Sequence, residues 1–324
     1  MPPTTAQCPA RTATLPWIAL GVVYLVWSST YLGIRFLIES APALLAGGAR
    51  FLCAGLVLAV IVTVIAGPGA LRFTRPQLGT AVLVGLLLPA CGQGLIMIAE
   101  HHVASGLTAL LVACMPLYVV LLRRALGERP HRVTMLGVGL GLGGLAVLVL
   151  AGAEGGSAGV TGNAWWGPWL VLLAVLGWSI GSVASTRLPT PPNPFALAAV
   201  EMLVGGVALA VVGLLAGERW DLAATSTSSW IAWGYLVVFG SLLAFSSYVY
   251  VLGRLPVSTV ATYTYVNPMI AVLLGVLLAG ERFSAVQLGG GLLVLLAVVL
   301  VIRAERPPQP EPVTTGPAAE AAAR

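Results

Sequence analysis

The sequence carries very little charge for its length of 324 residues. Only 8% of its residues are charged, whereas a soluble domain carries about 25%. Lysine is absent, so all sixteen basic residues are arginine, and Asp221 is the only aspartate. A phosphate-binding loop needs its lysine, and membrane prenyl chemistry needs runs of acidic residues such as aspartate. ATP-driven transport and prenyl transfer by this chain are therefore excluded on these grounds.

The cysteines likewise give no sign of a metal site. The four cysteines show no metal-ligand spacing, and three lie in apolar runs, so we interpret them as small apolar side chains: Cys8, Cys53, Cys91 and Cys114. The net charge of +5 comes from arginines scattered over helix ends, so no nucleic acid partner is expected. Residues 177–181 fit the nucleophile-elbow pattern, but they lie within an apolar run, and we interpret the match as chance. We expect neither an enzyme nor a cofactor.

Apolar residues are abundant instead. They make up 58% of the chain, and the mean hydropathy is +0.97. A membrane-spanning helix needs about 20 mostly apolar residues. Ten windows qualify: residues 17–37, 43–66, 77–99, 103–123, 132–151, 164–186, 194–216, 229–252, 257–279 and 284–302. The sequence therefore predicts an all-α membrane protein with ten transmembrane helices, surrounded by the lipid bilayer.

The arginines predict how the chain crosses the membrane. With the N-terminus in the cytoplasm, twelve arginines lie on the cytoplasmic side and three, Arg35, Arg219 and Arg282, lie on the other. Because positive residues are enriched in cytoplasmic segments, we expect a multi-pass protein of the cell inner membrane with both termini cytoplasmic. Three segments are expected outside the spans: 1–16 as a cytoplasmic tail rather than a signal peptide, 152–163 as an extracytoplasmic loop, and 304–324 as a disordered cytoplasmic tail.

The chain also contains an internal repeat. Four pairs of segments match at offsets of 151 to 153: Trp27-Ser28 with Trp178-Ser179, Arg50-Phe51 with Glu201-Met202, Pro116 with Pro268, and Gly127-Glu128-Arg129 with Gly280-Glu281-Arg282. Each half, residues 17–151 and 164–303, holds five predicted spans, so the second half must enter the membrane from the opposite side. Inverted repeats of this kind recur in secondary transporters, which bind substrate near the midplane between the repeats.

These motifs resemble those of a known family. The matching segments are 27–31, 49–51, 99–101, 105–106, 116–117, 127–129 and 261–268, and they look like those of the EamA-type drug/metabolite transporters of the DMT superfamily. The resemblance covers residues 15–303, and Glu100-His101 and Tyr265–Pro268 look closest to the YedA-like exporter branch of bacterial inner membranes. It implies ten helices in two EamA repeats and export of small metabolites or toxic compounds. It does not imply one substrate, because the superfamily carries amino acids, sugars, nucleotide derivatives and cationic drugs.

Arg50 and Glu201 are the sharpest candidates for function. Both lie inside apolar spans, where a charge is costly and usually faces the interior of the bundle with a partner. They occupy equivalent positions in the two halves, so a two-fold axis would place them symmetrically about a central cavity. We expect them to pair or to divide the charges of a zwitterionic substrate. A structural ion pair that fixes helix register is the alternative.

Aromatic and small polar residues supply the other candidates for a substrate site. The aromatic side chains can pack on apolar or cationic substrates, or only against neighbouring helices: Trp27, Tyr31, Trp178, Tyr248 and Tyr263. The polar side chains can bind a substrate or bond helices together: Ser28, Gln93, Ser179, Ser182 and Asn267. Pro116 and Pro268 are candidate gating hinges, with a static kink as the alternative.

Two further features stay open at this point. Glu100, His101 and His102 fall in the short turn after the third span, where they could sense the outer pH or simply be solvated, and they are too few for a metal site. Glycines at 137–144 and 289–291 form small-residue faces that favour close packing within the monomer, while a homodimer contact is the alternative.

The sequence favours a secondary transporter that exports small metabolites, such as amino acids, or drugs by alternating access, with Glu201 as the proton-coupling residue. Two alternatives remain. An uncoupled facilitator or exchanger would leave Glu201 ionised beside Arg50. A non-transporting membrane sensor or scaffold would have tightly filled halves, whereas a transporter needs a cavity between them.

Overall fold

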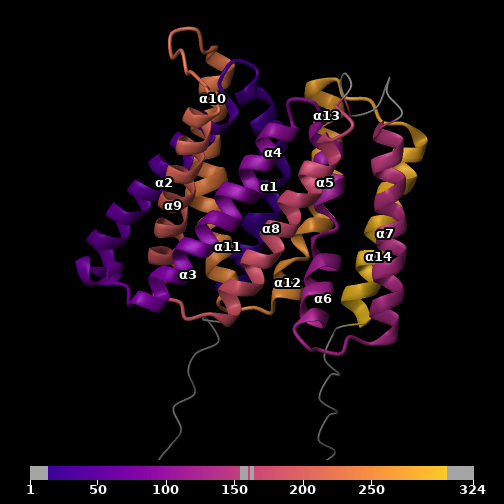
Figure 1. The fold of residues 1–324 in the computed structure, drawn as a ribbon, viewed down its shortest axis with the longest axis horizontal. Coiled ribbons are helices and arrows are strands. Elements are labelled where there is room, and N and C mark those ends of the chain that lie inside the picture. The colour runs from indigo at the N-terminus through magenta and orange to yellow at the C-terminus, as the bar shows by residue number, and fades with distance from the viewer. Residues whose placement is uncertain (1–13, 154–159, 161–163, 305–324) are drawn as a thin grey trace, which may run out of the picture.

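The computed structural model describes residues 14–153, 160 and 164–304, and within them the chain is helical apart from short connections and one isolated bridge, Val103 to Val160. The first half contains α1 (Leu15–Ile38), α2 (Ala43–Ala66), η2 (Pro68–Leu71), α3 (Arg75–Gly85), η3 (Leu86–Gln93), α4 (Gly94–Ala99), α5 (Ser105–Val112), α6 (Met115–Ala125) and α7 (Arg132–Ala153). The second half contains α8 (Gly167–Arg187), α9 (Pro194–Leu215), α10 (Thr227–Tyr235), η4 (Leu236–Phe245), α11 (Ser246–Leu252), α12 (Val257–Val260), α13 (Tyr263–Ala279) and α14 (Ala285–Ala304). Figure 1 shows these helices side by side in one bundle.

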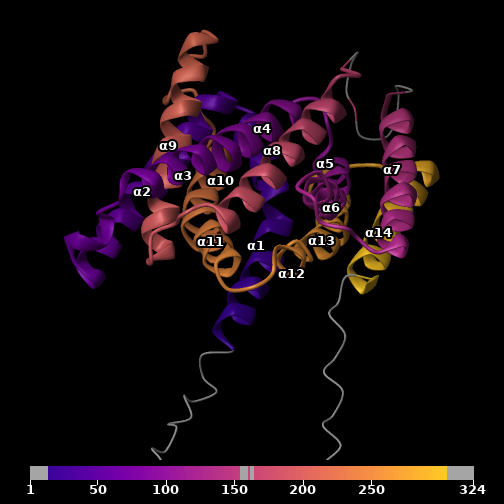
Figure 2. The same cartoon turned by 60° about the horizontal axis from the view of Figure 1, so that its bottom comes forward.

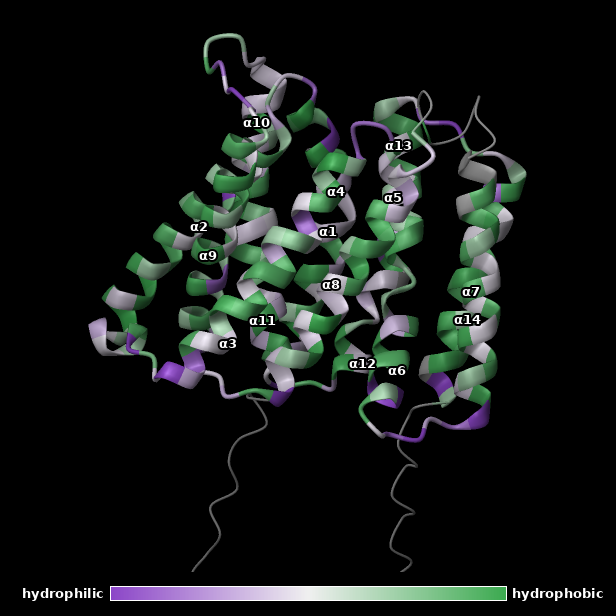
Figure 3. Cartoon of the chain, viewed as in Figure 1, coloured by the Kyte–Doolittle hydropathy of each residue, from purple (hydrophilic) through white to green (hydrophobic). Residues whose placement is uncertain are grey.

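The helices have the length and composition of membrane spans. Within the described residues, seven helical stretches are long and apolar enough to cross a membrane: Leu15–Ile38, Ala43–Ala66, Arg75–Ala99, Ser105–Ala125, Gly167–Arg187, Pro194–Leu215 and Thr227–Leu252. Three shorter apolar helices, Arg132–Leu148, Val266–Ala279 and Ala285–Val301, lie in the remaining predicted windows. Hydrophobic residues cover most of the bundle's length, and hydrophilic residues gather mainly at its two ends (Figure 3). The predicted all-helical membrane protein is thus confirmed.

The two ends of the bundle differ in which turns they hold. The start of α1 and the end of α14 lie at the same end (Figure 1), which we call the terminal end. We call the opposite end the far end. Because successive long helices run in opposite directions, the far end holds the turns that follow α1, α4, α9 and α13.

The closest helix packing relates α2 to α9 symmetrically. A β-carbon on Gly206 would lie 2.9 Å from the carbonyl oxygen of Gly48, and one on Gly55 would lie 3.1 Å from the carbonyl oxygen of Ala199. Gly55 and Gly206 are 151 positions apart, and so are Gly48 and Ala199. Each contact is therefore the repeat image of the other. Small residues let the two backbones approach where larger side chains would hold them apart.

Two of the spans widen in the middle into π-helical turns, at η3 and η4. These segments stand at equivalent places in the two halves, and such widened turns are frequent at functional sites. Two other spans are broken: α5 and α6 are separated at Ala113-Cys114, and α12 and α13 at Ala261-Thr262. The two π-helical segments and the break at Ala113-Cys114 lie midway along their spans, whereas the break at Ala261-Thr262 lies near the start of its span.

Helices α7 and α14 form a pair at one side of the bundle (Figures 1 and 2). A β-carbon on Gly144 would lie 3.0 Å from the carbonyl oxygen of Gly290, and one on Gly290 would lie 3.2 Å from the carbonyl oxygen of Gly144. These two glycines therefore serve packing within the chain. Gly139 and Gly289 have no such neighbour among the described residues.

Candidate central cavity

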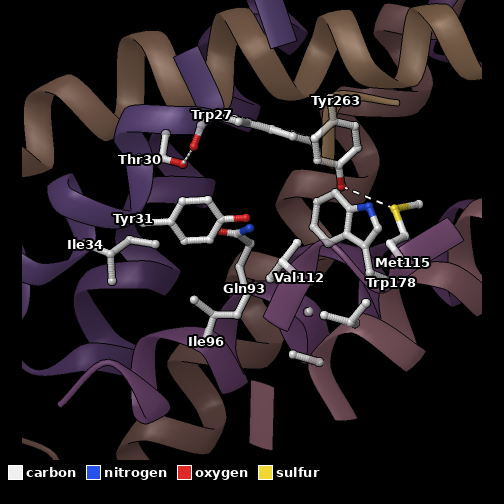
Figure 4. Close-up of a pocket in the computed structure, with 13 residues that line it drawn as sticks. Trp27, Thr30, Tyr31, Ile34, Gln93, Ile96, Val112, Met115, Trp178 and Tyr263 are labelled. Carbon is white, nitrogen blue, oxygen red and sulfur yellow. Dashed lines mark hydrogen bonds between the residues drawn. The ribbon is translucent and has the colours of Figure 1, made fainter. Parts of the chain in front are cut away.

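A cavity lies inside the bundle and is lined by residues from both halves (Figure 4). Its volume is about 30 Å³, room for about two water molecules, so the two halves must move apart before it can admit a larger molecule. Its lining consists of Trp27, Thr30, Tyr31, Ile34, Gly92, Gln93, Ile96, Val112, Met115, Ala174, Val175, Trp178 and Tyr263. None of these described lining residues is charged.

One wall of the cavity is a cluster of aromatic rings. Trp27 packs edge-on against Trp178, with ring centroids 5.3 Å apart, and against Tyr263 at 5.2 Å. Trp27 also contacts Tyr248 at 4.9 Å. Aromatic pairs at these distances stabilise one another beyond their buried area. The two tryptophans that the repeat relates therefore meet at the centre of the molecule, although they are 151 positions apart in the chain.

Hydrogen bonds hold the cluster in place. The indole nitrogen of Trp178 donates to the Tyr248 hydroxyl at 3.0 Å, and that hydroxyl also bonds Ser182 at 2.7 Å. The indole nitrogen of Trp27 donates to the carbonyl of Gly240 in η4 at 3.2 Å. The Tyr263 hydroxyl makes a long contact of 3.4 Å with the sulfur of Met115. Since buried polar groups need partners, these bonds fix the ring orientations.

Tyr31 and Gln93 supply the polar lining of the cavity. In Figure 4 the Tyr31 hydroxyl lies beside the Gln93 side-chain amide. Gln93 is half-buried and ends the π-helical segment η3, which turns it inward. An amide and a phenol can together donate to and accept from a bound molecule.

The small polar candidates lie behind the lining rather than in it. Ser179 donates to the carbonyl of Val175 at 2.7 Å, and Ser182 donates to that of Trp178 at 2.7 Å. With its amide nitrogen turned toward α1, Asn267 donates to the Ser28 hydroxyl at 3.0 Å. These bonds lie within a helix or join α13 to α1. The structure therefore favours the helix-bonding alternative for Ser28, Ser179, Ser182 and Asn267.

Arg50 is buried but is not among the residues that line the cavity. Only 2% of it is exposed, its Nε donates to the Ser241 hydroxyl in η4 at 2.7 Å, and its guanidinium lies over the Phe51 ring. Its Nη1 has no hydrogen-bond partner among the described residues. Arg50 thus joins α2 to η4.

Glu201 is fully buried, and neither carboxylate oxygen has a partner in the described part of the chain. Arg50 and Glu201 form no ion pair in the described residues, which corrects the expectation that they pair. The repeat explains the difference between them. Arg50 bonds Ser241, and the position 152 residues earlier is Pro89, which offers Glu201 no hydroxyl.

The two candidate hinge prolines occupy different places. Pro116 stands in the first turn of α6, directly after the break between α5 and α6. Pro268 lies inside α13. Proline is tolerated in a first turn but removes a hydrogen bond in a helix interior. The repeat mates are therefore not structurally equivalent here, and a gating role remains a proposal.

Sequence reasoning missed most of the apolar lining of the cavity. Ile34, Ile96, Val112 and Met115 give no polar signal, and Thr30 is one of many hydroxyl-bearing residues in the spans. On α1, however, the lining residues 27, 30, 31 and 34 follow helical spacing and form one face. Once Trp27 and Tyr31 are candidates, the same face could have supplied Thr30 and Ile34.

The cavity and the helical architecture define a membrane transporter class, and comparisons with known proteins identify the family. The chain belongs to the EamA-like transporter family, whose family model matches it twice, at residues 15–150 and 165–303. It is 38% identical to the uncharacterized inner membrane transporter YedA of Escherichia coli K12 over 284 residues, which are 87% of this chain and 89% of YedA.

More distant relatives are named as transporters too, or lie outside bacteria. A "Probable terminal-alkyne amino-acid exporter" of Streptantibioticus cattleyicolor is 28% identical over 88% of this chain and 92% of its own. A chloroplastic WAT1-related protein of Arabidopsis thaliana is 26% identical over 89% of this chain and 69% of its own. One protein crystal structure aligns with a TM-score of 0.65 at 20% identity, covering 92% of this chain and all of that one, which supports the fold.

Proposed function

We propose that this transporter is a secondary exporter of small metabolites, such as amino acids, or of drugs, and that it works by alternating access between two inverted five-helix repeats. The observation that carries the proposal is the cavity, because residues of both halves line it and the repeat mates Trp27 and Trp178 meet beside it. A molecule held there would be released to one side or the other as the halves exchange conformations.

The architecture of the proposal is ten spans with both termini in the cytoplasm. The seven long apolar helices and the three shorter ones together match the ten predicted windows. The reciprocal glycine contacts of α2 and α9 support a two-fold relation between the halves. Under this orientation the far end of the bundle is extracytoplasmic, and the terminal end, with most of the arginines, is cytoplasmic.

The lining points to a substrate class. Aromatic rings, one amide and hydroxyl groups suit an organic molecule with an apolar, aromatic or cationic body and a few hydrogen-bonding groups. An amino-acid derivative fits this description, which agrees with the name of one relative. Gln93 and Tyr31 would bind its polar groups, and Trp27, Trp178 and Tyr263 would pack on its body.

Proton coupling through Glu201 is the second part of the proposal. A fully buried carboxylate without a hydrogen-bond donor favours its neutral, protonated form. Movement of the halves that brought Glu201 to water would release that proton. Pro116 stands directly after the break between α5 and α6, and Pro268 interrupts the hydrogen bonding inside α13, so each is a place where hinge motion could be absorbed.

Efflux from membrane vesicles tests both parts. Vesicles from expressing cells are loaded with a labelled amino-acid and drug panel, and efflux is measured with and without an imposed pH gradient. Trp178→Ala should reduce efflux at least about tenfold by removing a cavity wall. Trp169→Ala is the matched control, since that tryptophan of the same helix is 54% exposed on the outer face.

The outcomes separate the alternatives. Gradient-driven efflux that disappears in Glu201→Gln would support proton antiport through that carboxylate. Efflux that ignores the gradient would indicate a facilitator or exchanger. Equal efflux from Trp178→Ala and Trp169→Ala would overturn the cavity as the transport site, and no efflux of any probe would favour a sensor or scaffold.

A further inference from the structure

The turn between α4 and α5 holds a carboxylate that the cavity does not use. Glu100 follows α4 directly and is 0% exposed, while its neighbour His101 is exposed. Neither carboxylate oxygen of Glu100 has a hydrogen-bond partner among the described residues. The solvated turn that the sequence allowed is therefore wrong for Glu100. Burying a charged carboxylate without donors is costly, so such a group binds a proton instead.

The neighbours of Glu100 also favour the protonated form of its carboxyl. Glu281, in the turn after α13, accepts hydrogen bonds from the backbone nitrogen of Ser105 at 2.8 Å, from its hydroxyl at 2.8 Å and from the backbone nitrogen of Gly106 at 3.1 Å. The Glu281 carboxylate thus accepts three hydrogen bonds at the start of α5. A negative charge on Glu100 would be repelled by the charge of Glu281. The negative charge of Glu281 therefore favours a proton on Glu100.

Arg35 of α1 is the positive group nearest to Glu100. Its Nη1 donates to the backbone carbonyl of Glu100 at 3.5 Å, and no ion pair joins the two side chains in the described residues. Burial raises the pKa of the Glu100 carboxyl well above its usual range, the charge of Glu281 raises it further, and Arg35 offsets part of this. The other titratable groups close to Glu100 are Tyr31 of α1, which interacts electrostatically with its carboxylate, and His101 and His102 of the same turn.

The pKa of His101 is shifted in the opposite direction to that of Glu100. Burial, His102 and Arg35 lower the pKa of His101, while Glu218 in the turn after α9 raises it. His102 packs its ring against Trp166, with centroids 5.3 Å apart. Neither histidine bonds the Glu100 carboxylate through any contact that the structure gives. Within this cluster, Glu100 is therefore the group that binds its proton because it is buried without hydrogen-bond donors.

The position of Glu100 links it to the cavity. Its backbone nitrogen donates to the carbonyl of Ile96 at 2.9 Å, and Ile96 lines the cavity. Arg35 follows Ile34, which also lines the cavity. Glu100 and Arg35 therefore stand one helical step beyond the lining, between the cavity and the far end of the bundle.

We propose that Glu100 is a proton-binding site at the far-end mouth of the cavity. While the turn is closed, the carboxyl carries a proton. When the turn opens to water, its O–H bond breaks, the proton passes to water at the far end, and the carboxylate becomes solvated. The inference rests on the proposed transport function, but the binding of a proton to Glu100 can be measured without any substrate.

The sign of the pH effect follows from linkage. The closed arrangement binds the proton more tightly than the open one, so acid at the far end favours closure and alkali favours opening. A substrate would thus leave toward that side more readily as the pH there rises. This dependence would be separate from that of Glu201, which lies inside the bundle.

Infrared difference spectroscopy of the full chain in lipid nanodiscs tests the proton site. The pH is stepped, and the carbonyl band of protonated carboxyl groups is followed. The native protein should show a component that persists well above the usual range of glutamate titration and disappears in Glu100→Gln. Glu128→Gln is the control, because that carboxylate is about one-third exposed and paired with arginine. It should leave the component unchanged.

The result that would overturn the proposal is a carboxyl band that is the same in the native protein and in Glu100→Gln. Should Glu100→Gln fail to fold, as judged by gel filtration, Glu100→Asp keeps a carboxyl and must shift the frequency or midpoint of the component. An unshifted component would equally overturn it. If the component is assigned to Glu100 but vesicles transport no probe, the transport proposal fails while the proton site stands.

Discussion

The two ends of the bundle use the same short motif in different ways. At the far end, Glu281 of Gly280-Glu281-Arg282 accepts three hydrogen bonds at the start of α5. At the terminal end its repeat mate, Glu128 of Gly127-Glu128-Arg129, bonds Arg123 at 2.6 Å and also pairs with Arg187. The first carboxylate completes a helix N-terminus of the other half, whereas the second joins arginine side chains that are roughly one-third exposed.

The two copies of the motif therefore make different contacts in this structure. Glycines at positive φ, 93° at Gly127 and 65° at Gly280, place both glutamates in comparable turns after a helix. What each glutamate meets depends on how the halves are tilted. An inverted-repeat transporter is expected to be closed more tightly at one end than at the other in any one state. In this structure the motif contacts the other half through backbone and hydroxyl donors of α5 at the far end and through the Arg187 side chain at the terminal end.

The largest effect is expected in the middle of the bundle, where the two halves should behave alike. Gly55→Leu and Gly206→Leu should each destabilise the fold by at least about 3 kcal/mol, because the side chain would meet the facing backbone. Since the two contacts are repeat images, the losses should be similar. Thermal unfolding in detergent measures both. Gly139→Leu, with no neighbour within 4 Å, is the control. A large loss in only one of the pair would break the proposed two-fold relation.

The far end should give the next largest effect. Glu281→Gln keeps the shape of the side chain but replaces a charge-assisted acceptor with an amide, whose nitrogen would face a backbone donor. Hydrogen bonds to a charged group contribute about 1.5–3 kcal/mol, and we expect a loss in that range. The melting temperature in detergent measures it. A loss no greater than that of Glu128→Gln would remove the contrast between the two ends.

A pH titration should sharpen the contrast. Because burial raises the pKa of Glu100, its contribution to stability is present at acid pH and is lost as the pH rises through the raised pKa. Unfolding measured across neutral and alkaline pH should therefore show a decline that Glu100→Gln removes. His101, whose pKa is lowered, acts in the opposite direction, because its contribution to stability is lost as the pH falls below neutrality. A decline that persists unchanged in Glu100→Gln would contradict the assignment.

The helical spans could be predicted because apolar windows report directly on lipid exposure. The repeat also picked out Arg50 and Glu201, and both prove to be buried. Their partners could not be predicted, since a serine or a proline at the facing position decides whether the charge finds a donor or acceptor. In the same way, the sequence marks Glu100 as part of a short turn, but only packing by α1 and the turn after α13 encloses it.

For the cavity, too, some residues could be predicted from the sequence and others could not. Aromatic residues stand out in a sequence, and Trp27, Tyr31, Trp178 and Tyr263 do line the space. Tyr248 does not, because its hydroxyl is already bonded to Trp178 and Ser182 behind the wall. Apolar lining residues look like any lipid-facing residue until the helices are placed together. Composition therefore predicts which side chains could form a site, and tertiary packing decides which ones do.

The terminal end should show the smallest effect. Glu128→Gln removes two ion pairs whose side chains are 32% to 41% exposed, and exposed pairs contribute about 0–1 kcal/mol. We expect a loss below about 1 kcal/mol that shrinks further in high salt, because exposed charges are screened. Melting at low and high ionic strength measures both. A loss as large as that of Glu281→Gln, and insensitive to salt, would mean that the arginine pairs close the terminal end as firmly as the helix cap closes the far end.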